Sequence, residues 1–303
     1  MNLFTMDTEK ITEHITLIKG KNQGRFPFSH SILVKDDVTA LIDTGCSIEN
    51  LNKLTPQEID IVINSHSHPD HTAGNWLFSD LPLKVPEEEV DFNSNIKKLS
   101  ERYAGEKLAK IWRNFVSQKM NFKNAQPMDT FHDTDTLDFG STTLEAVHTP
   151  GHTIGHYCFF ERNERILFSF DIDFTKFGPW YGHEESDIEQ FKASIEKVRA
   201  LNPKIVVSSH RGIINKDIDK EFEHFSRIFQ ERDERILNFL DRERTLQEIV
   251  DSALIYRDFS FHPLLLKYWE GMMIRKHLKG LLNAGVVIKT RKGFKRDPLS
   301  QGN

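Results

Sequence analysis

One six-residue segment constrains this chain more than any other part of its sequence. It follows the apolar stretch Ile59–Asn64, which we expect to be a buried strand, and it reads His66-Ser67-His68-Pro69-Asp70-His71. Alternate residues of an extended chain point the same way, so the first two histidines can face one point. The bend at the proline lets the aspartate and the last histidine reach a second point. Imidazole and carboxylate groups suit zinc, iron or manganese, so we predict a metal site and disfavour a surface loop that is histidine-rich by chance.

Strand patterns surround this segment in two successive groups. The first group is Ile15–Ile18, Ser31–Val34, Thr39–Ile42 and Ile59–Asn64. The second group is Thr142–Val147, Tyr157–Phe160, Arg165–Phe170 and Lys204–Ser208. Helical patterns follow each group, including one that Ser186-Asp187 begins and Asn202-Pro203 ends. This order favours an α/β protein with two packed sheets and helices outside, an αββα sandwich, over a doubly wound parallel sheet.

Two further regions lie outside these strand groups. Apolar residues spaced by three or four over 95–122 predict a helical insertion or lid at about 88–126. After a charge-rich helix over 217–244, short helices are expected at 245–252, 262–269 and 272–283, followed by a basic hairpin at 286–290 and 293–296. Three helices and a hairpin are typical of a winged-helix unit. We therefore expect a first domain over 1–230 and a winged-helix-like α domain over 231–303.

Three later motifs complete a family pattern. They are Thr149-Pro150-Gly151-His152-Thr153, Leu167-Phe168-Ser169-Phe170-Asp171 and Val207-Ser208-Ser209-His210. Together with the first segment, and in this order, they resemble the four motifs of the metallo-β-lactamase superfamily over roughly residues 12–215. The resemblance implies the four-layer αββα fold of that family and a hydrolase with two divalent metal ions, for which zinc is favoured and iron or manganese are alternatives.

The resemblance also implies a role for each residue that matches a motif. The first metal would take His66, His68 and His152, and the second would take Asp70, His71 and His210. Asp171 would bridge the two ions and leave room for a shared hydroxide as the nucleophile. Asp70 would also act in catalysis, by orienting this hydroxide or carrying its proton onward.

This sequence departs from the family pattern at two positions. Phe170 stands where the family usually has a glycine before the bridging aspartate, and His210 is followed by Arg211-Gly212 rather than by the usual glycine-flanked turn. Both departures could alter access to the second metal, but neither removes a ligand. The presence of Asp171 argues against a true β-lactamase, because those enzymes lack that bridge.

Residues outside the motifs suggest how a substrate could be bound. Trp180 and Tyr181 lie in a loop that glycines and a proline hold, so we predict that they form a substrate wall, with a simple hydrophobic plug as an equal alternative. Arg211 could grip an anionic substrate or pair with a surface carboxylate. We expect His156 to hydrogen-bond a ligand or the backbone, and His183 to be an ordinary surface or core histidine.

Composition limits the function classes. A net charge of −5 and a pI near 6.3 give no global reason for nucleic-acid binding, although the hairpin is locally basic. The longest apolar runs fall far short of the roughly 20 residues that span a membrane, so no membrane partner is expected. The absence of a secretory segment in residues 1–21 and the two cysteines, Cys46 and Cys158, favour a reduced cytoplasmic protein.

The preferred function is hydrolysis of an ester, thioester or related bond in a small metabolite, with a glyoxalase-II-like thioesterase as the nearest model. One alternative is an endoribonuclease with the same two metals, in which RNA would be the partner. A second is a mononuclear iron enzyme that resembles the persulfide dioxygenases. A binding module without chemistry is the least favoured reading, because the ligand set is intact. The terminal unit could also serve packing, substrate gating or homodimer formation.

Overall fold

The computed structural model describes residues 6–298 and contains two large sheets and a hairpin. The first sheet has the order β1-β2-β3-β4-β5-β6-β7, with bounds Thr8–Lys10, Ile15–Ile18, Ser31–Lys35, Thr39–Ile42, Ile61–Ile63, Leu83–Pro86 and Asp129–Phe131. The second has the order β13-β12-β11-β10-β9-β8, and its strands from β8 onward are Thr136–Asp138, Thr143–His148, Tyr157–Glu161, Ile166–Phe170, Ile205–Ser208 and Gly212–Ile214. The hairpin pairs β14, Val287–Lys289, with β15, Phe294–Arg296.

The helices lie between and after these strands. Their bounds are α1 Ile48–Leu51, α2 Pro69–Thr72, α3 Val90–Ser94, α4 Ile96–Met120, α5 Ile188–Arg199, α6 Ile218–Phe239, α7 Leu246–Asp251 and α8 Pro263–Asn283. Short 3₁₀ helices cover Lys21–Gly24, Pro56–Glu58, Asn75–Phe78 and Glu87–Glu89. As predicted, Asp187 caps the start of α5, because its side chain accepts a hydrogen bond from the backbone N–H of Gln190.

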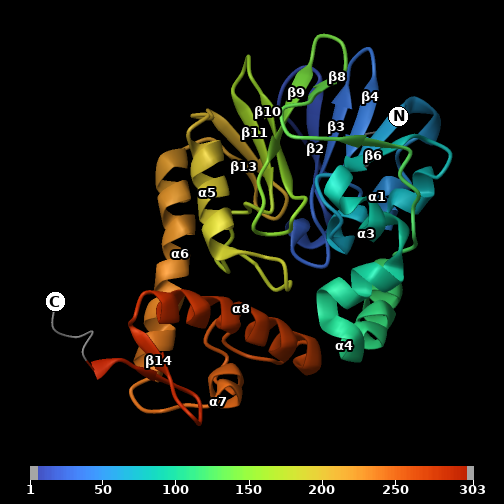
Figure 1. The fold of residues 1–303 in the computed structure, drawn as a ribbon. Coiled ribbons are helices and arrows are strands. Elements are labelled where there is room, and N and C mark those ends of the chain that lie inside the picture. Colours follow the sequence, from blue (N-terminus) through green and yellow to red (C-terminus); the bar gives the residue numbers. More distant parts are fainter. Residues whose placement is uncertain (1–5, 299–303) are drawn as a thin grey trace.

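The two large sheets pack face to face, and helices cover their outer faces (Figure 1). The core between the sheets contains apolar side chains from both of them, such as Ile32 and Val34 of β3 and Phe159 and Phe168 of the second sheet. In Figure 1, α1 and α3 lie beside the first sheet, and α5 and α6 lie beside the second. This arrangement is the predicted αββα sandwich. It confirms the fold class, because alternation along each strand gives each sheet one face for the shared core and one face for helices.

The helices α3 and α4 occupy the predicted insertion. The side chain of Asn95 caps the start of α4, and Gly105, at a φ of 60°, kinks the helix. Side chains of α4 such as Tyr103 and Trp112 form a separate apolar cluster with Leu265 and Trp269 of α8. The insertion is thus packed against the C-terminal part of the chain.

The C-terminal part differs from the sequence-based expectation. The two helices expected at 262–269 and 272–283 are one helix, α8, because Gly271 does not interrupt it. The helix expected over 217–244 ends at Phe239, and the predicted domain boundary near residue 231 lies inside it. Three helices (α6, α7, α8) and the β14–β15 hairpin are present, but the winged-helix architecture and the division at this boundary stay predictions.

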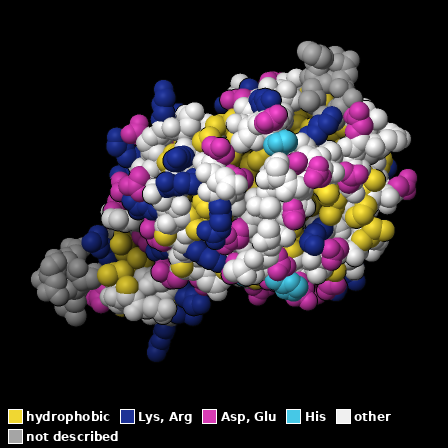
Figure 2. Space-filling view, turned by 90° about the horizontal axis from the view of Figure 1, so that it is seen from above, with side chains coloured by type: hydrophobic (Ala, Val, Ile, Leu, Met, Phe, Trp, Pro, Cys, Tyr) yellow, Lys and Arg dark blue, Asp and Glu magenta, His cyan; other side chains and the backbone are white. Residues whose placement is uncertain are grey.

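The surface carries charges of both signs. On the face drawn in Figure 2, lysine and arginine side chains are mixed with aspartate and glutamate, and no broad area of one sign is seen. This mixture fits the small net charge of −5. Within residues 6–298, none of the helices combines the length and the apolar character that crossing a membrane would need.

Candidate metal centre

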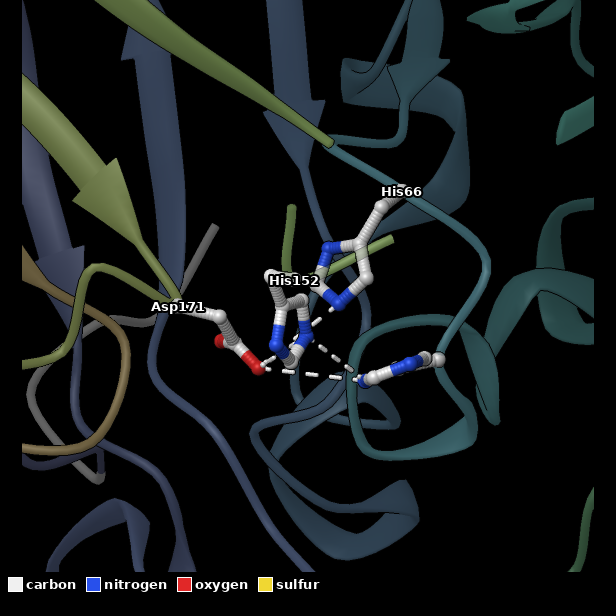
Figure 3. A group of neighbouring side chains, drawn as sticks. His66, His152 and Asp171 are labelled. Carbon is white, nitrogen blue, oxygen red and sulfur yellow. Dashed lines mark hydrogen bonds and ion pairs between the residues drawn. The ribbon is translucent and has the colours of Figure 1, made fainter. Parts of the chain in front are cut away.

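Seven histidine and aspartate side chains converge where strands of both sheets end. One group consists of His66, His68, His152 and Asp171, and the other consists of Asp70, His71 and His210; within each group the ligand-type atoms lie within 4.8 Å of one another. Figure 3 shows His66, His152 and Asp171 reaching a common point from three different segments. Every residue that the sequence assigned to the metals is therefore in one place.

Local chain geometry explains this convergence. His66 follows β5, Asp171 follows β11 directly, and His210 lies in the turn between β12 and β13. Pro69 is the first residue of α2, a position that tolerates proline, and this short helix turns Asp70 and His71 away from the preceding histidines. His152 comes from the loop between β9 and β10.

Asp171 lies between the two groups with one oxygen toward each. Its Oδ2 atom is 3.0 Å from His152 Nε2 and 3.7 Å from His66 Nε2. Its Oδ1 atom is 2.8 Å from His71 Nε2 and 3.4 Å from His210 Nε2. This is the geometry that a carboxylate needs in order to bridge two cations.

The outward ring nitrogens of four histidines contact oxygen acceptors. The Ser65 hydroxyl already donates to Asp43 Oδ2 at 2.8 Å, so this hydroxyl accepts from His66. The other three acceptors are carbonyl or carboxylate oxygens, which cannot donate. The pairs are His66 Nδ1 with Ser65 Oγ at 3.0 Å, His71 Nδ1 with Asp43 Oδ2 at 2.7 Å, His152 Nδ1 with the Trp180 carbonyl at 2.8 Å, and His210 Nδ1 with the Gly24 carbonyl at 2.6 Å.

When the rings are in the neutral form that binds a metal, these outward bonds direct unprotonated nitrogens into the site. A neutral imidazole carries a single proton, and each of the four rings would use it on its outward acceptor. His66 Nε2 is buried without a hydrogen-bond partner. His68 Nδ1 and His152 Nε2 lie only 3.0 Å apart. Inward lone pairs at such short separations repel one another unless cations lie among them, so the donor set fits bound divalent metal ions.

Burial and the two carboxylates set the protonation of the centre. Burial keeps the pKa of His66 and of His68 well below the ordinary histidine value. Burial also lowers the pKa of His210, but the carboxylates of Asp171 and Asp70 outweigh this effect and raise that pKa to about 9. Burial raises the pKa of Asp70. A metal that binds here therefore displaces protons from the group around Asp70 and His210.

A cleft of about 420 Å³ opens onto both groups. Aromatic side chains dominate its walls, and they come from the first sheet's loops, from α4, from the loop after β11 and from the C-terminal part. They are Phe26, Tyr103, Phe177, Trp180, Tyr256, Phe261 and Trp269. Trp180 thus lies where the sequence analysis placed it, at the wall of the cleft.

The structure places two of the predicted substrate contacts away from this cleft. Tyr181 is fully buried, and its hydroxyl is hydrogen-bonded to His277 and Arg232 on the side away from the cleft. Its neighbour Trp180 lines the cleft, so these two adjacent side chains of the loop face different sides. Arg211 does not line this cleft; its guanidinium pairs with Glu221 at 2.5 and 2.7 Å. The pairing with a surface carboxylate, which was the alternative for this arginine, is the one present in the structure.

Two residues behind the predicted metal ligands were not predicted from the sequence. Asp43 follows β4 and is fully buried; it accepts bonds from His71 and from Ser65. The sequence signal that could have identified Asp43 is an acidic residue directly after an apolar strand. His183, expected to be ordinary, is fully buried and lies 2.7 Å from His68. His156 matches its expected role, because its Nε2 accepts the backbone N–H of Asp171 at 3.2 Å.

The Phe170 departure has a visible structural consequence. This residue has a φ of 45°, in the left-handed region that favours glycine. Its ring is buried between the sheets and packs edge-on against Phe159. The register between β11 and β12 shifts between Phe168 and Phe170, and Asp171 follows at once. The strained backbone therefore turns Asp171 out of the strand and into the site.

Comparison with known proteins agrees with this fold and site. A family model described as "Metallo-beta-lactamase superfamily" matches residues 24–210. This match covers more than half of the chain, so the protein belongs to the metallo-β-lactamase superfamily. It is a metal-dependent hydrolase.

Curated relatives resemble the chain at low identity. The "Beta-lactamase-like protein 2 homolog" of Caenorhabditis elegans is 22% identical over 293 residues, which cover 92% of this chain and 88% of that protein. The human "Acyl-coenzyme A thioesterase MBLAC2" is 24% identical, over 56% of this chain and 59% of that protein. The "Atrochrysone carboxyl ACP thioesterase" of Passalora fulva is 25% identical, over 69% of this chain and 56% of that protein.

Solved structures confirm the architecture. A metallo-beta-lactamase family protein of Thermus thermophilus superposes with a TM-score of 0.66 at 22% identity, covering 89% of this chain and 94% of its own. A beta-lactamase domain protein of Burkholderia ambifaria superposes with a TM-score of 0.68 at 16% identity, covering 96% and 94%. At these identities the likeness establishes the fold.

Proposed function

We propose that this enzyme hydrolyses thioesters that carry an apolar acyl group, with two divalent ions, zinc being favoured, held by the seven converging residues. The observation that carries the proposal is the aromatic cleft that opens onto both groups of ligands. Apolar walls with a few polar groups at one end suit a ligand whose apolar part is bound and whose reactive bond lies at the polar end.

The charges in the cleft favour a neutral bond over a phosphodiester. Among the described residues that line it, Arg25 is the one arginine or lysine, whereas Asp173 and Asp258 are acidic residues that do not belong to the metal ligands. An RNA backbone needs several cationic contacts, and acidic walls repel it. The endoribonuclease alternative therefore finds no support in the cleft.

Two relatives are named as thioesterases, one for acyl-coenzyme A and one for an acyl carrier protein substrate. Both names describe thioesters of a large thiol carrier. These relatives support the reaction class, while the aromatic walls of this chain support the apolar acyl group. The second ligand group, Asp70, His71 and His210, is complete, which favours a dinuclear centre over the mononuclear iron alternative.

Bound metal ions, the aromatic walls and Asp70 would have different roles in the reaction. Divalent ions bound here would supply Lewis acidity and a water molecule that ionises near neutral pH. The aromatic walls would hold the acyl chain and keep bulk water from the reacting carbonyl. Asp70, buried at the floor of the cleft, would accept the proton of the attacking water and pass it toward the leaving thiolate.

A substrate panel with one cleft variant tests the proposal. We expect acyl thioesters to be hydrolysed with rates that change little with salt, and RNA to be left intact. Trp180→Ala should raise KM for longer acyl chains by roughly 10-fold, since it removes apolar wall but keeps the backbone carbonyl that holds His152. Trp76→Ala is the matched control, because that tryptophan contacts Asn121 and Lys123 outside the cleft. Cleavage of RNA with no thioesterase activity would refute the proposal.

A further inference from the structure

We propose that His183 is a positioning residue that fixes the tautomer and orientation of His68. This inference rests on the proposed metal-binding role of His68. The two rings meet through their Nε2 atoms at 2.7 Å, with ring centres 4.9 Å apart and ring planes at 65°. His183 is fully buried and His68 is 4% exposed, so water does not compete for this contact.

The direction of this hydrogen bond follows from the other side of His183. Its Nδ1 atom lies 3.2 Å from the backbone carbonyl oxygen of Arg102, which can only accept. The single proton of a neutral His183 therefore sits on Nδ1, and its Nε2 is an acceptor. Within residues 6–298 no carboxylate pairs with this buried ring, which favours the neutral form.

His68 must then donate from Nε2. Its own single proton is used on His183, so its Nδ1 atom keeps a free lone pair. That atom points into the first ligand group, 3.0 Å from His152 Nε2 and 3.8 Å from Asp171 Oδ2. The Arg102 carbonyl, His183 and His68 thus form a directed chain that ends at the site where the metal is expected. The other ligand histidines reach an oxygen acceptor directly, without an intervening ring.

The position of His183 is fixed from several sides. Its backbone N–H donates to Ser186 Oγ at 3.2 Å, and the Ser186 hydroxyl donates to the carbonyl of His152 at 2.8 Å. Lys276 of α8 donates to the carbonyl of His183 at 2.5 Å. The Tyr103 ring of α4 meets its ring edge-on, with centres 4.4 Å apart. Side chains of α4 and α8 therefore both help to hold the histidine that contacts His68.

Two variants separate positioning from packing. His183→Phe keeps a ring of similar size but cannot accept a hydrogen bond, whereas His183→Gln keeps an acceptor of similar reach. We expect His183→Phe to weaken zinc binding by roughly 10–100-fold and His183→Gln to recover most of the loss. His277→Phe is the matched control: it also removes a buried, hydrogen-bonded histidine, but His277 contacts Tyr181 and Asp233 rather than a metal ligand, so zinc affinity should be unchanged.

The closing experiment reads the tautomer of His68 in the metal-free protein by ¹⁵N NMR, alongside zinc affinity by chelator competition. The His68 signal is assigned by its loss in His68→Gln. We expect the His68 proton on Nε2 in the wild type and a mixture of tautomers in His183→Phe. A proton on Nδ1 in the wild type, or a folded His183→Phe with wild-type zinc affinity, would overturn the inference. Neither readout requires thioester turnover, so an incorrect substrate would leave this result intact.

Discussion

At the scale of single residues, the acceptor behind each histidine determines which ring nitrogen faces the centre. Carbonyl and carboxylate oxygens cannot donate, so a neutral ring that contacts one of them turns a lone pair inward. Asp43 and the carbonyl of Gly24 act in this way on His71 and His210. The ligand histidines could be predicted because each lies in a short motif at a strand end. His183 could not, because 115 positions separate it from His68.

The buried ring of His30 gives a prediction about how the free energy of unfolding depends on pH. This buried ring accepts the backbone N–H of Gly20 at 2.8 Å on Nδ1, and burial lowers its pKa from 6.5 to about 4. As the pH falls, His30 is therefore protonated at a higher pH in the unfolded chain than in the folded chain. The stability that the neutral His30 ring contributes is complete above pH 6.5 and is lost as the pH falls toward 4. We expect the wild type to lose up to about 3 kcal/mol relative to His30→Asn over this window.

The measurement is urea unfolding of both proteins at several pH values between neutral and 4. Asparagine can still accept the Gly20 N–H but does not titrate, so it isolates the histidine from the other acid-sensitive groups. Parallel pH profiles for the two proteins would contradict the prediction.

At the scale of elements, the long apolar strands were predicted correctly and the short edge strands were not. β1 and β8 have three residues each and are largely exposed, so they carry no alternating pattern to read. The break expected inside α8 is absent because tertiary contacts override the helix cost of Gly271, which is about 1 kcal/mol. The preceding residue, Glu270, accepts the backbone N–H groups of Ile255 and Tyr256 at 3.0 Å each and ties the α7–α8 connection to this helix.

A buried ion pair within the helical insertion contacts the loop that carries the predicted metal ligands, and it gives a stability prediction. Arg102 of α4 pairs with Glu89 at 2.5 Å and donates to the hydroxyl of Ser67, which lies between two predicted metal ligands. Glu89→Gln would leave the buried guanidinium with the partly exposed Glu185 as its remaining charge partner. We expect the free energy of unfolding to fall by about 3–5 kcal/mol.

The matched control is the exposed pair between Asp91 and Lys98, which lies in the same part of the chain. Asp91→Asn should cost no more than about 1 kcal/mol, because water screens exposed charges. Denaturant unfolding of both variants measures the difference. Equal losses in the free energy of unfolding for the two variants would contradict the prediction, because the buried pair would then contribute no more than the exposed pair.

At the scale of the whole molecule, the walls of the cleft come from regions that lie far apart in the sequence and were predicted as separate units. Phe26 comes from the first sheet's loops, Tyr103 from the insertion, and Trp269 from α8. Such a wall could not be predicted from sequence, because it depends on how the insertion and the C-terminal part pack over the sandwich. The same limit explains why Tyr181 was predicted at the cleft and Tyr256 was not.

A shared core leads to a prediction about domain independence. Met273 and Ile274 of α8 belong to the same buried cluster as Phe191 of α5 and Phe225 of α6. We therefore expect a fragment of residues 1–230 to lack a cooperative unfolding transition, because it would expose this cluster to water. Thermal unfolding of the fragment checks this. A cooperative transition with retained zinc binding would instead support two separate domains with a boundary near residue 231.

The central claim is that seven residues hold two metal ions and that these ions are needed for hydrolysis. Elemental analysis of the purified protein, with activity measured on the same samples, tests it most directly. We predict about two divalent ions per chain in the wild type, and a loss of at least one ion and nearly all activity in a folded Asp171→Ala variant, since both oxygens of Asp171 face ligand groups. A metal-free wild type that stays fully active, or an Asp171→Ala variant with unchanged metal content and rate, would contradict the claim.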